Sequence, residues 1–229
     1  MAYKILVTIP SFSERAREIL AALGEVTYVE ATNESITQHI GDVEVLLVGL
    51  GTVYSKEVLK HAPHLKVLAT ATTGLDHIDL VYAKERGITV LSLKGENDFL
   101  DTITGTGELA FGLMLSLVRR IPAATLDVLS GGWNREAFKG VSLYGKTLGI
   151  VGMGRLGKIM AAGAAGFRMK VIFYDPHVPE GSFPSYSKVS FEELLQESDV
   201  VSLHVHLSDE TRHLLDKKAL SLLKKSAIL

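Results

Sequence analysis

The sequence predicts an α/β protein with two domains, each built on a parallel sheet of the Rossmann-like or flavodoxin-like kind, the second incomplete at its C-terminal end. Three observations predict this fold class. Short apolar runs alternate with amphipathic helical patterns along most of the 229 residues, as in βαβ units. Continuous apolar runs such as Val45–Val48 are typical of parallel strands that are covered on both faces. A glycine-rich turn at 152–157 joins a strand pattern to a helix pattern.

In the first half of the chain, strand patterns alternate with helix patterns. The strand patterns cover residues 4–9, 26–30, 43–50, 66–72 and 89–93, and the helical patterns cover 13–23, 34–40, 56–61 and 80–86. Ser13 is a favourable N-cap for the first helix, which we expect to end at Gly24, and Gly87 closes the last helix.

From about residue 98 the pattern changes. We expect one long helix over 98–120, a second helix over 122–130 after a proline kink, then strands at 147–151, 171–174 and 199–205 and helices at 155–165, 191–197 and 217–224. The predicted domains are therefore 1–97 and 98–229. Residues 226–229 resemble the opening of a further strand. Because proteins avoid an unpaired apolar sheet edge, we expect the second domain to be truncated.

Composition excludes several classes of protein. With 24 basic and 26 acidic residues the net charge is −2, so the chain lacks the excess of positive charge that is typical of proteins that bind nucleic acid or an anionic membrane. The absence of cysteine excludes disulfides, thiolate metal sites and a cysteine nucleophile. The most apolar stretch, 109–118, has ten residues, whereas a membrane span needs about 20. We expect a cytoplasmic protein with no nucleic-acid or membrane partner.

The glycine-rich turn carries the strongest local signal. Gly152 permits the tight turn, Gly154 lets a pyrophosphate approach the backbone, and Gly157 allows close packing of helix on strand. Asp175 ends the next strand, 18 residues after Gly157, near the spacing of an acid that binds ribose hydroxyls. Together these features predict a dinucleotide site at the N-terminus of the helix that begins at Arg155.

Two other patterns are weaker. Residues 140–147 match the phosphate-loop pattern GxxxxGKT, but a strand pattern follows where a helix is required, so we interpret the match as chance. His204 and His206 stand two apart on a predicted strand and would share a face near the cofactor crevice. No third ligand is placed beside them, so we expect no metal site. Surface solvation is expected for the other histidines, His39, His61, His64, His77, His177 and His213.

A set of ordered motifs resembles the D-isomer-specific 2-hydroxyacid dehydrogenases, a family that includes phosphoglycerate, glycerate, D-lactate and formate dehydrogenases. The motifs are 73–79 (TGLDHID), Asn97, Glu108, 131–135 (GGWNR), 145–157, 174–176 (YDP), 198–204 and 210–213. The resemblance covers essentially the whole chain.

The resemblance implies an NAD-binding domain and a substrate domain. Arg155 and Leu156 would contact the pyrophosphate and Asp175 the adenosine ribose. The residues that it implies for the cofactor, together with the glycine turn, are Thr73, Thr106, Gly152, Gly154, Arg155, Leu156, Gly157, Asp175, Val205, His206 and Thr211. Backbone groups near Leu50, Gly51, Thr73 and Gly74 would hold the substrate carboxylate.

The chain also departs from the family pattern. The family's catalytic arginine, glutamate and histidine would all lie beyond Leu229, so no catalytic residue is assigned and the 229-residue chain is expected to be inactive. His206 stands where proline is usual and Arg168 where glycine is usual. Two arginines typical of the phosphoglycerate branch are absent, one near Leu50 and one near Thr70, which disfavours a phosphorylated substrate.

The preferred interpretation is an NAD-dependent oxidoreductase acting on the CH–OH group of a small D-2-hydroxy acid. The alternative is a non-catalytic NAD(H)-binding, corepressor-like protein or an inactive fragment of the same family. NADP is disfavoured by Asp175. A homodimer is expected through residues 98–140, because the helix there is apolar around much of its circumference and Trp133 follows on a loop.

Overall fold

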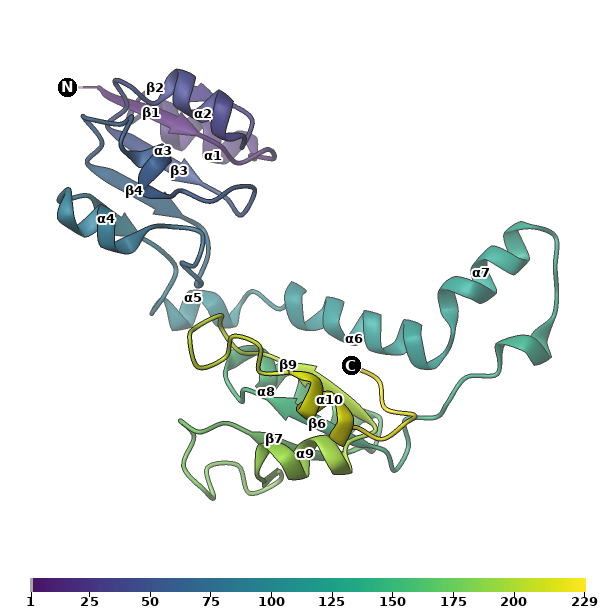
Figure 1. The fold of residues 1–229 in the computed structure, drawn as a ribbon. Coiled ribbons are helices and arrows are strands. Elements are labelled where there is room, and N and C mark those ends of the chain that lie inside the picture. Colours follow the sequence, from purple (N-terminus) through teal and green to yellow (C-terminus); the bar gives the residue numbers. More distant parts are fainter. Residues whose placement is uncertain (1) are drawn as a thin grey trace. The chain divides into compact units, whose positions relative to one another are not determined.

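The computed structural model describes residues 2–229, and the chain divides into two compact units, Met1–Leu100 and Asp101–Leu229. Each unit contains its own parallel sheet flanked by helices (Figure 1). The α/β fold class with two parallel sheets, expected from the alternating patterns, is confirmed.

The sheet of the first unit has five strands in the order β2-β1-β3-β4-β5. The strands are β1 (Tyr3–Val7), β2 (Gly24–Tyr28), β3 (Val45–Val48), β4 (Val67–Thr70) and β5 (Thr89–Leu91), and every pairing is parallel. This is the flavodoxin-like order, in which the direction of chain progression reverses between β1 and β3. Loops that follow β1, β3 and β4 therefore meet at one edge of the sheet.

Helices connect these strands, and their caps follow the sequence. They are α1 (Glu14–Ala21), α2 (Asn33–His39), α3 (Lys56–Leu59) and α4 (Leu80–Glu85), and α5 (Asn97–Asp101) follows β5. Ser13 caps α1 as predicted, accepting a hydrogen bond from the Ala16 N–H, and Asp79 caps α4 through the Tyr82 N–H. Leu6, Leu46 and Leu68 are fully buried in the core of this unit.

Gly24 does not end α1, contrary to the prediction. It begins β2, beside Tyr3 of β1. A Cβ atom on Gly24 would lie 2.0 Å from the Tyr3 carbonyl oxygen, so glycine is needed for the approach of two strands rather than for a helix cap.

The sheet of the second unit has the order β8-β7-β6-β9. Its parallel strands are β6 (Thr147–Val151), β7 (Lys170–Tyr174), β8 (Ser187–Lys188) and β9 (Val200–Leu203). In chain order this is 3-2-1-4, the arrangement of the Rossmann fold. Ile228 forms an isolated parallel bridge with Val200 at the outer side of β9, but residues 226–229 are not assigned as a strand, so the expected strand opening is seen at this one residue only. The two-residue β8 was not predicted.

Three helices cover this second sheet: α8 (Arg155–Gly166), α9 (Phe191–Glu197) and α10 (Lys217–Leu222). Arg168, between α8 and β7, has a φ of 54°. This left-handed conformation explains why the resemblance places glycine there, since a side chain makes it unfavourable.

The predicted single helix over 98–120 is wrong. α5 ends at Asp101 and α6 (Gly105–Val118) begins after a break. The break holds the β-branched residues Thr102, Ile103 and Thr104, which have modest helix propensity. The Ile103 carbonyl accepts a hydrogen bond from the Arg155 guanidinium, which lies far along the chain and is invisible to local patterns.

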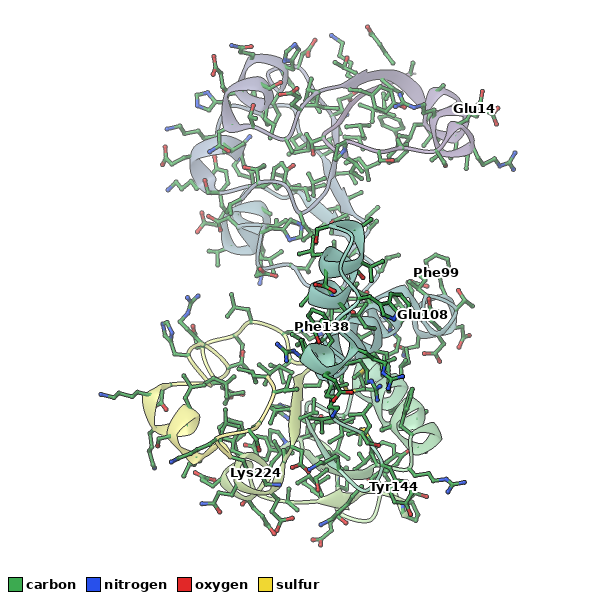
Figure 2. All side chains as sticks on the ribbon, turned by 90° about the vertical axis from the view of Figure 1, so that its right-hand side faces the viewer. Glu14, Phe99, Glu108, Phe138, Tyr144 and Lys224 are labelled. Carbon is green, nitrogen blue, oxygen red and sulfur yellow. The ribbon has the colours of Figure 1, made fainter. Side chains whose placement is uncertain are left out.

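The segment that follows α6 does not lie against the sheet of the second unit. Arg120 has a φ of 55°, which separates α6 from α7 (Ile121–Leu129). Figure 1 shows α7 and the following 3-10 turn η1 (Arg135–Phe138), which was not predicted, standing away from β6–β9. The Arg120 guanidinium lies 6.0 Å from the ring centre of Phe138, labelled in Figure 2. Every residue of α7 is exposed or half-buried.

Within residues 2–229 no single helix has the length and apolar character needed to cross a membrane. The segments Asn97–Val118 and Ile121–Leu129, bent by 67°, reach that length and composition only when counted together.

Candidate functional site

The turn after β6 is shaped by two glycines that the fold itself requires. Gly152 has a φ of 91°, and a Cβ atom there would lie 2.4 Å from the His204 carbonyl oxygen. A Cβ atom on Gly157 would lie 2.2 Å from the Gly152 carbonyl oxygen. Both positions therefore exclude a side chain for reasons internal to the protein, as predicted for the turn and for helix–strand packing.

Gly154 differs from its two neighbours in the motif. It is exposed and precedes α8 as its N-cap, and no heavy atom of the described residues lies within 4 Å of where its Cβ would be. The fold therefore leaves room for a side chain that the sequence does not supply. Open backbone at the start of a 12-residue helix is the arrangement in which free N–H groups bind a phosphate.

Asp175 lies beside this turn, directly after β7. One oxygen of its half-buried carboxylate accepts a hydrogen bond of 2.9 Å from the Met153 N–H, and the other accepts one of 2.9 Å from the His177 N–H. The structure thus brings the acid and the glycine turn together, 22 residues apart in sequence. Both oxygens keep further lone pairs for a ligand hydroxyl.

Arg155 and Leu156 open α8 and are half-buried. The Arg155 guanidinium donates to the Ile103 carbonyl in the break between α5 and α6. Thr106 is exposed in the first turn of α6, whose Gly107 packs on Ile159 of α8. The first turns of α6 and α8 therefore lie close together.

The loop after β9 lies against the glycine turn, since His204 donates its N–H to the Val151 carbonyl at 2.7 Å. Val205 and His206 follow in this loop and are exposed. The Thr211 hydroxyl donates to the His206 carbonyl at 2.6 Å and accepts from the Ser208 N–H at 2.8 Å. Thr211 thus fixes the shape of the loop that carries the two predicted cofactor residues.

The predicted strand placement of the histidine pair is wrong. β9 ends at Leu203, one residue before His204, so His204 and His206 both lie in the loop and do not share a strand face. His204 is half-buried and its Nε2 lies 2.8 Å from the Ser202 hydroxyl, while His206 is exposed. Burial lowers the pKa of His204. Among residues 2–229 no group of three or more His, Asp or Glu side chains is arranged to bind a metal.

In the first unit, the residues predicted to bind a carboxylate lie in the loops after β3 and β4. Leu50 is 72% exposed, and Gly51 follows it. Thr73 and Gly74 are half-buried, and the Gly74 carbonyl accepts a hydrogen bond of 2.7 Å from the Thr72 hydroxyl. Both loops follow carboxyl ends of neighbouring parallel strands, where α/β proteins bind ligands.

The two loops are joined by backbone hydrogen bonds. Tyr54 donates its N–H to the His77 carbonyl at 2.7 Å, and its own carbonyl accepts the Asp79 N–H at 3.0 Å. Tyr54 is fully buried, and its hydroxyl lies 2.6 Å from that of Thr8. Burial raises the pKa of Tyr54, so the phenol stays neutral.

His77 was expected to be solvated, and this expectation is wrong. Only 5% of the residue is exposed, because the turn after β4 folds it beneath the loop towards Tyr54 and Thr70. Burial lowers the pKa of His77, with the Asp76 carboxylate opposing the shift. Sequence reasoning missed this residue, although its apolar neighbour Ile78 and the helix cap Asp79 were signals that the chain turns inward here.

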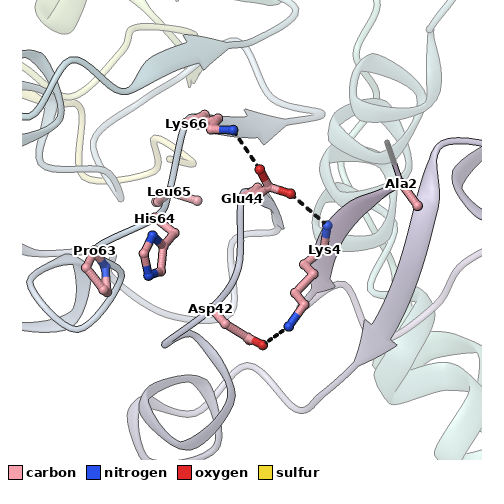
Figure 3. Close-up of a pocket in the computed structure, with 8 residues that line it drawn as sticks. All are labelled: Ala2, Lys4, Asp42, Glu44, Pro63, His64, Leu65 and Lys66. Atoms are coloured by element: carbon pink, nitrogen blue, oxygen red, sulfur yellow. Dashed lines mark hydrogen bonds and ion pairs between the residues drawn. The ribbon is translucent and has the colours of Figure 1, made fainter.

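A cavity of about 500 Å³ lies at the opposite edge of the first sheet (Figure 3). Figure 3 shows its charged side chains paired: Lys4 with Asp42, and Lys66 with Glu44 at 2.6 Å. It adjoins the amino ends of β1, β3 and β4, away from the predicted site. Such exposed ion pairs contribute little to stability, and their mutual pairing leaves no charge directed at a ligand.

The phosphate-loop match at 140–147 has no phosphate-loop structure. η1 precedes it and β6 follows it, whereas the loop requires a preceding strand and a following helix. Gly140 instead packs on the backbone of Val118, where a Cβ atom would lie 2.4 Å from the carbonyl oxygen. The interpretation of this match as chance is confirmed.

A Rossmann-type sheet, an open glycine turn at a helix N-terminus and an acid at the end of the next strand define a dinucleotide-binding protein. Comparison with known proteins gives the family. The D-isomer specific 2-hydroxyacid dehydrogenase NAD binding domain matches residues 111–229, and the catalytic domain of the same family matches residues 5–99. The chain belongs to the D-isomer specific 2-hydroxyacid dehydrogenases, and its second unit is an NAD-binding domain.

Individual relatives agree with this assignment. The chain is 39% identical over 230 residues to a D-3-phosphoglycerate dehydrogenase of Methanocaldococcus jannaschii, covering 99% of this chain and 43% of that protein. It is 38% identical to a hydroxypyruvate reductase of Thermotoga maritima, covering 90% and 65%. A D-lactate dehydrogenase of Aquifex aeolicus, solved with NAD and lactic acid, superposes with a TM-score of 0.82 at 29% identity, covering 96% and 66%. The chain thus spans less than two thirds of these two curated relatives.

Proposed function

We propose that the complete protein is an NAD-dependent oxidoreductase that interconverts a small D-2-hydroxy acid and its 2-oxo acid. Residues 98–229 are the NAD-binding domain and residues 1–97 the substrate domain. The observation that carries the proposal is the open Gly154 at the start of α8 with the Asp175 carboxylate beside it. Packing within the protein does not require glycine at position 154. A pyrophosphate that approaches the backbone closely would require it.

The cofactor would be held by groups from four segments of the second unit. Backbone N–H groups at Arg155 and Leu156 face the pyrophosphate, and Asp175 accepts the ribose hydroxyls. Thr106, Val205, His206 and Thr211 complete the set. When bound, NAD supplies the hydride acceptor or donor for the reaction.

The substrate carboxylate would be bound by backbone N–H groups near Leu50, Gly51, Thr73 and Gly74. Backbone donors suit a carboxylate, because charge-assisted hydrogen bonds are stronger than neutral ones. Thr70, near which the resemblance places an arginine in the phosphoglycerate branch, is buried and hydrogen-bonded to Thr72 at 3.0 Å. With no cation at that position, we propose an unphosphorylated acid such as glyoxylate or hydroxypyruvate.

The test is cofactor binding and turnover measured separately. NADH binding to the 229-residue chain, followed by calorimetry, should be detectable, whereas Gly154→Ala should weaken it. Reduction of glyoxylate and hydroxypyruvate is then assayed with the complete protein, because this chain spans only 43% and 65% of two curated relatives. NADH binding without turnover by the complete protein would favour the non-catalytic NAD(H)-binding alternative.

We further propose that the protein forms a homodimer through residues 98–140. Leu109, Leu113 and Leu117 recur every fourth residue on one face of α6 and are 62%, 57% and 55% exposed. Leu129 of α7 and Trp133 are 78% and 85% exposed. So much exposed apolar surface on one segment is typical of an interface. Localisation in the cytoplasm stays a prediction from the sequence.

A further inference from the structure

We propose that His77 is a positioning residue for substrate binding, which holds the loop carrying Thr73 and Gly74 against the loop carrying Leu50 and Gly51. This inference rests on the proposed function of these loops as the carboxylate site.

His77 belongs to a layer of buried polar side chains beneath the two loops. Thr8, Thr70 and His77 are each 5% exposed or less, and Tyr54 is fully buried. Thr8 follows β1, Tyr54 lies beyond β3, and Thr70 ends β4, so the layer extends along the carboxyl edge of the sheet. Polar groups are costly to bury, and their concentration at this edge indicates that they serve the loops above.

A chain of side-chain contacts leads from His77 to the loop. Its Nε2 lies 3.4 Å from the Thr70 hydroxyl, which lies 3.0 Å from the Thr72 hydroxyl. The Thr72 hydroxyl donates to the Gly74 carbonyl at 2.7 Å. The first contact is long, so we assign His77 the role of a spacer and aligning partner for Thr70 rather than that of a strong donor.

The backbone and ring of His77 engage the other loop. Its carbonyl accepts the Tyr54 N–H at 2.7 Å, and its ring meets the Tyr54 ring edge-on, with centres 6.4 Å apart. Tyr54 lies only three residues beyond Gly51. His77 is therefore in contact, directly or through threonines, with both segments that would bind the acid.

An apolar side chain at position 77 could occupy the same buried space without leaving a polar atom that lacks a hydrogen bond. Nδ1 of His77 is buried and has no hydrogen-bond partner among the residues that the structure describes. A position selected for packing alone would favour leucine or phenylalanine, since an unpaired buried nitrogen is unfavourable. We explain the imidazole at this position by the alignment that its Nε2 gives to Thr70.

The experiment compares His77→Leu, His77→Gln and Thr72→Val in the complete protein, with His64→Leu as control for an exposed histidine of the same unit. Glutamine places an amide near the position of Nε2 and should preserve the contact with Thr70. Steady-state kinetics with glyoxylate and hydroxypyruvate give KM and kcat, and fluorescence titration gives the Kd for NADH.

For His77→Leu we expect KM for the 2-oxo acid to rise about tenfold, with kcat and the NADH Kd within about twofold of the parent. His77→Gln should recover most of the loss, and Thr72→Val should raise KM in the same way even if His77→Leu does not fold. Unchanged KM in Thr72→Val, or an equal loss in His77→Gln and His77→Leu, overturns the positioning role. A parent protein that binds NADH but turns over no 2-oxo acid overturns the proposed function and this inference with it.

Discussion

The carboxylate of Asp175 accepts a hydrogen bond of 2.9 Å from the backbone N–H of Met153, inside the glycine-rich turn. The residue expected to select the cofactor therefore also fixes the turn that would face the pyrophosphate. His177 adds a second backbone N–H to the same carboxylate, at 2.9 Å. The carboxylate at the end of β7 thus holds the glycine-rich turn in place before any cofactor binds. Changes at Asp175 should therefore affect both the choice of cofactor and the affinity for it.

The first prediction concerns cofactor choice. NADH should bind at least about tenfold more tightly than NADPH, or about 1.4 kcal/mol, because a 2′-phosphate would lie against the Asp175 carboxylate. Calorimetric titration with each cofactor measures the ratio. Asp175→Ala should reduce the ratio and also weaken NADH, since the Met153 N–H loses its acceptor. A ratio that does not change in Asp175→Ala would show that another residue is the selector.

The second prediction separates the glycines of the turn. Gly154→Ala should leave the melting temperature within about 2 °C of the parent, because its Cβ meets open space, while NADH binding weakens about tenfold or more. Gly157→Ala should instead destabilise the second unit by about 2 kcal/mol or more, since its Cβ would lie 2.2 Å from the Gly152 carbonyl.

Thermal unfolding and NADH titration of both variants check this contrast. Gly166→Ala is the matched control, because its Cβ also meets open space and it lies at the far end of α8. If Gly154→Ala bound NADH as tightly as Gly166→Ala does, the open turn would not be the pyrophosphate site.

The third prediction concerns the exposed face of α6. Leu113→Glu should convert a dimer into a monomer at micromolar concentration, because a charge would be buried in the interface. Light scattering gives the mass directly. Glu14 of α1 offers the control Glu14→Gln, which changes charge at an exposed position outside residues 98–140. A monomer mass for the parent protein under the same conditions would refute the interface.

The fourth prediction concerns pH. Burial lowers the pKa of His77 below its ordinary 6.5 in the folded chain, so the unfolded chain takes up a proton first on acidification. The contribution of His77 to the free energy of unfolding is therefore complete above pH 6.5. It is lost as the pH falls from 6.5 towards the lower folded value. A pKa difference of one corresponds to about 1.4 kcal/mol.

Urea denaturation between about pH 7.5 and about pH 5.5 measures this loss. His77→Gln has no imidazole at this position and should show a smaller decrease than the parent. His204, whose pKa burial also lowers, should contribute a decrease of the same sign in the second unit. An identical decrease in the parent and in His77→Gln would contradict the assignment.

Much of the fold and the glycine turn followed from the sequence because their determinants are local. Strand and helix periodicity, the cap at Ser13, and the strand–turn–helix spacing around Gly152 depend on residues within a few positions of each other. The acid at Asp175 was predicted by spacing alone, since one βαβ unit sets how far it lies from the turn.

Only the tertiary structure decided the features that depend on distant segments. The burial of His77, the role of Gly24 in strand approach and the break before α6 each arise from contacts with Tyr54, Tyr3 and Arg155 respectively. A polar residue in a polar stretch gives no local sign that another loop will cover it. Periodicity reports which face of an element is apolar, whereas the neighbours that meet that face are set by the packing of the whole unit.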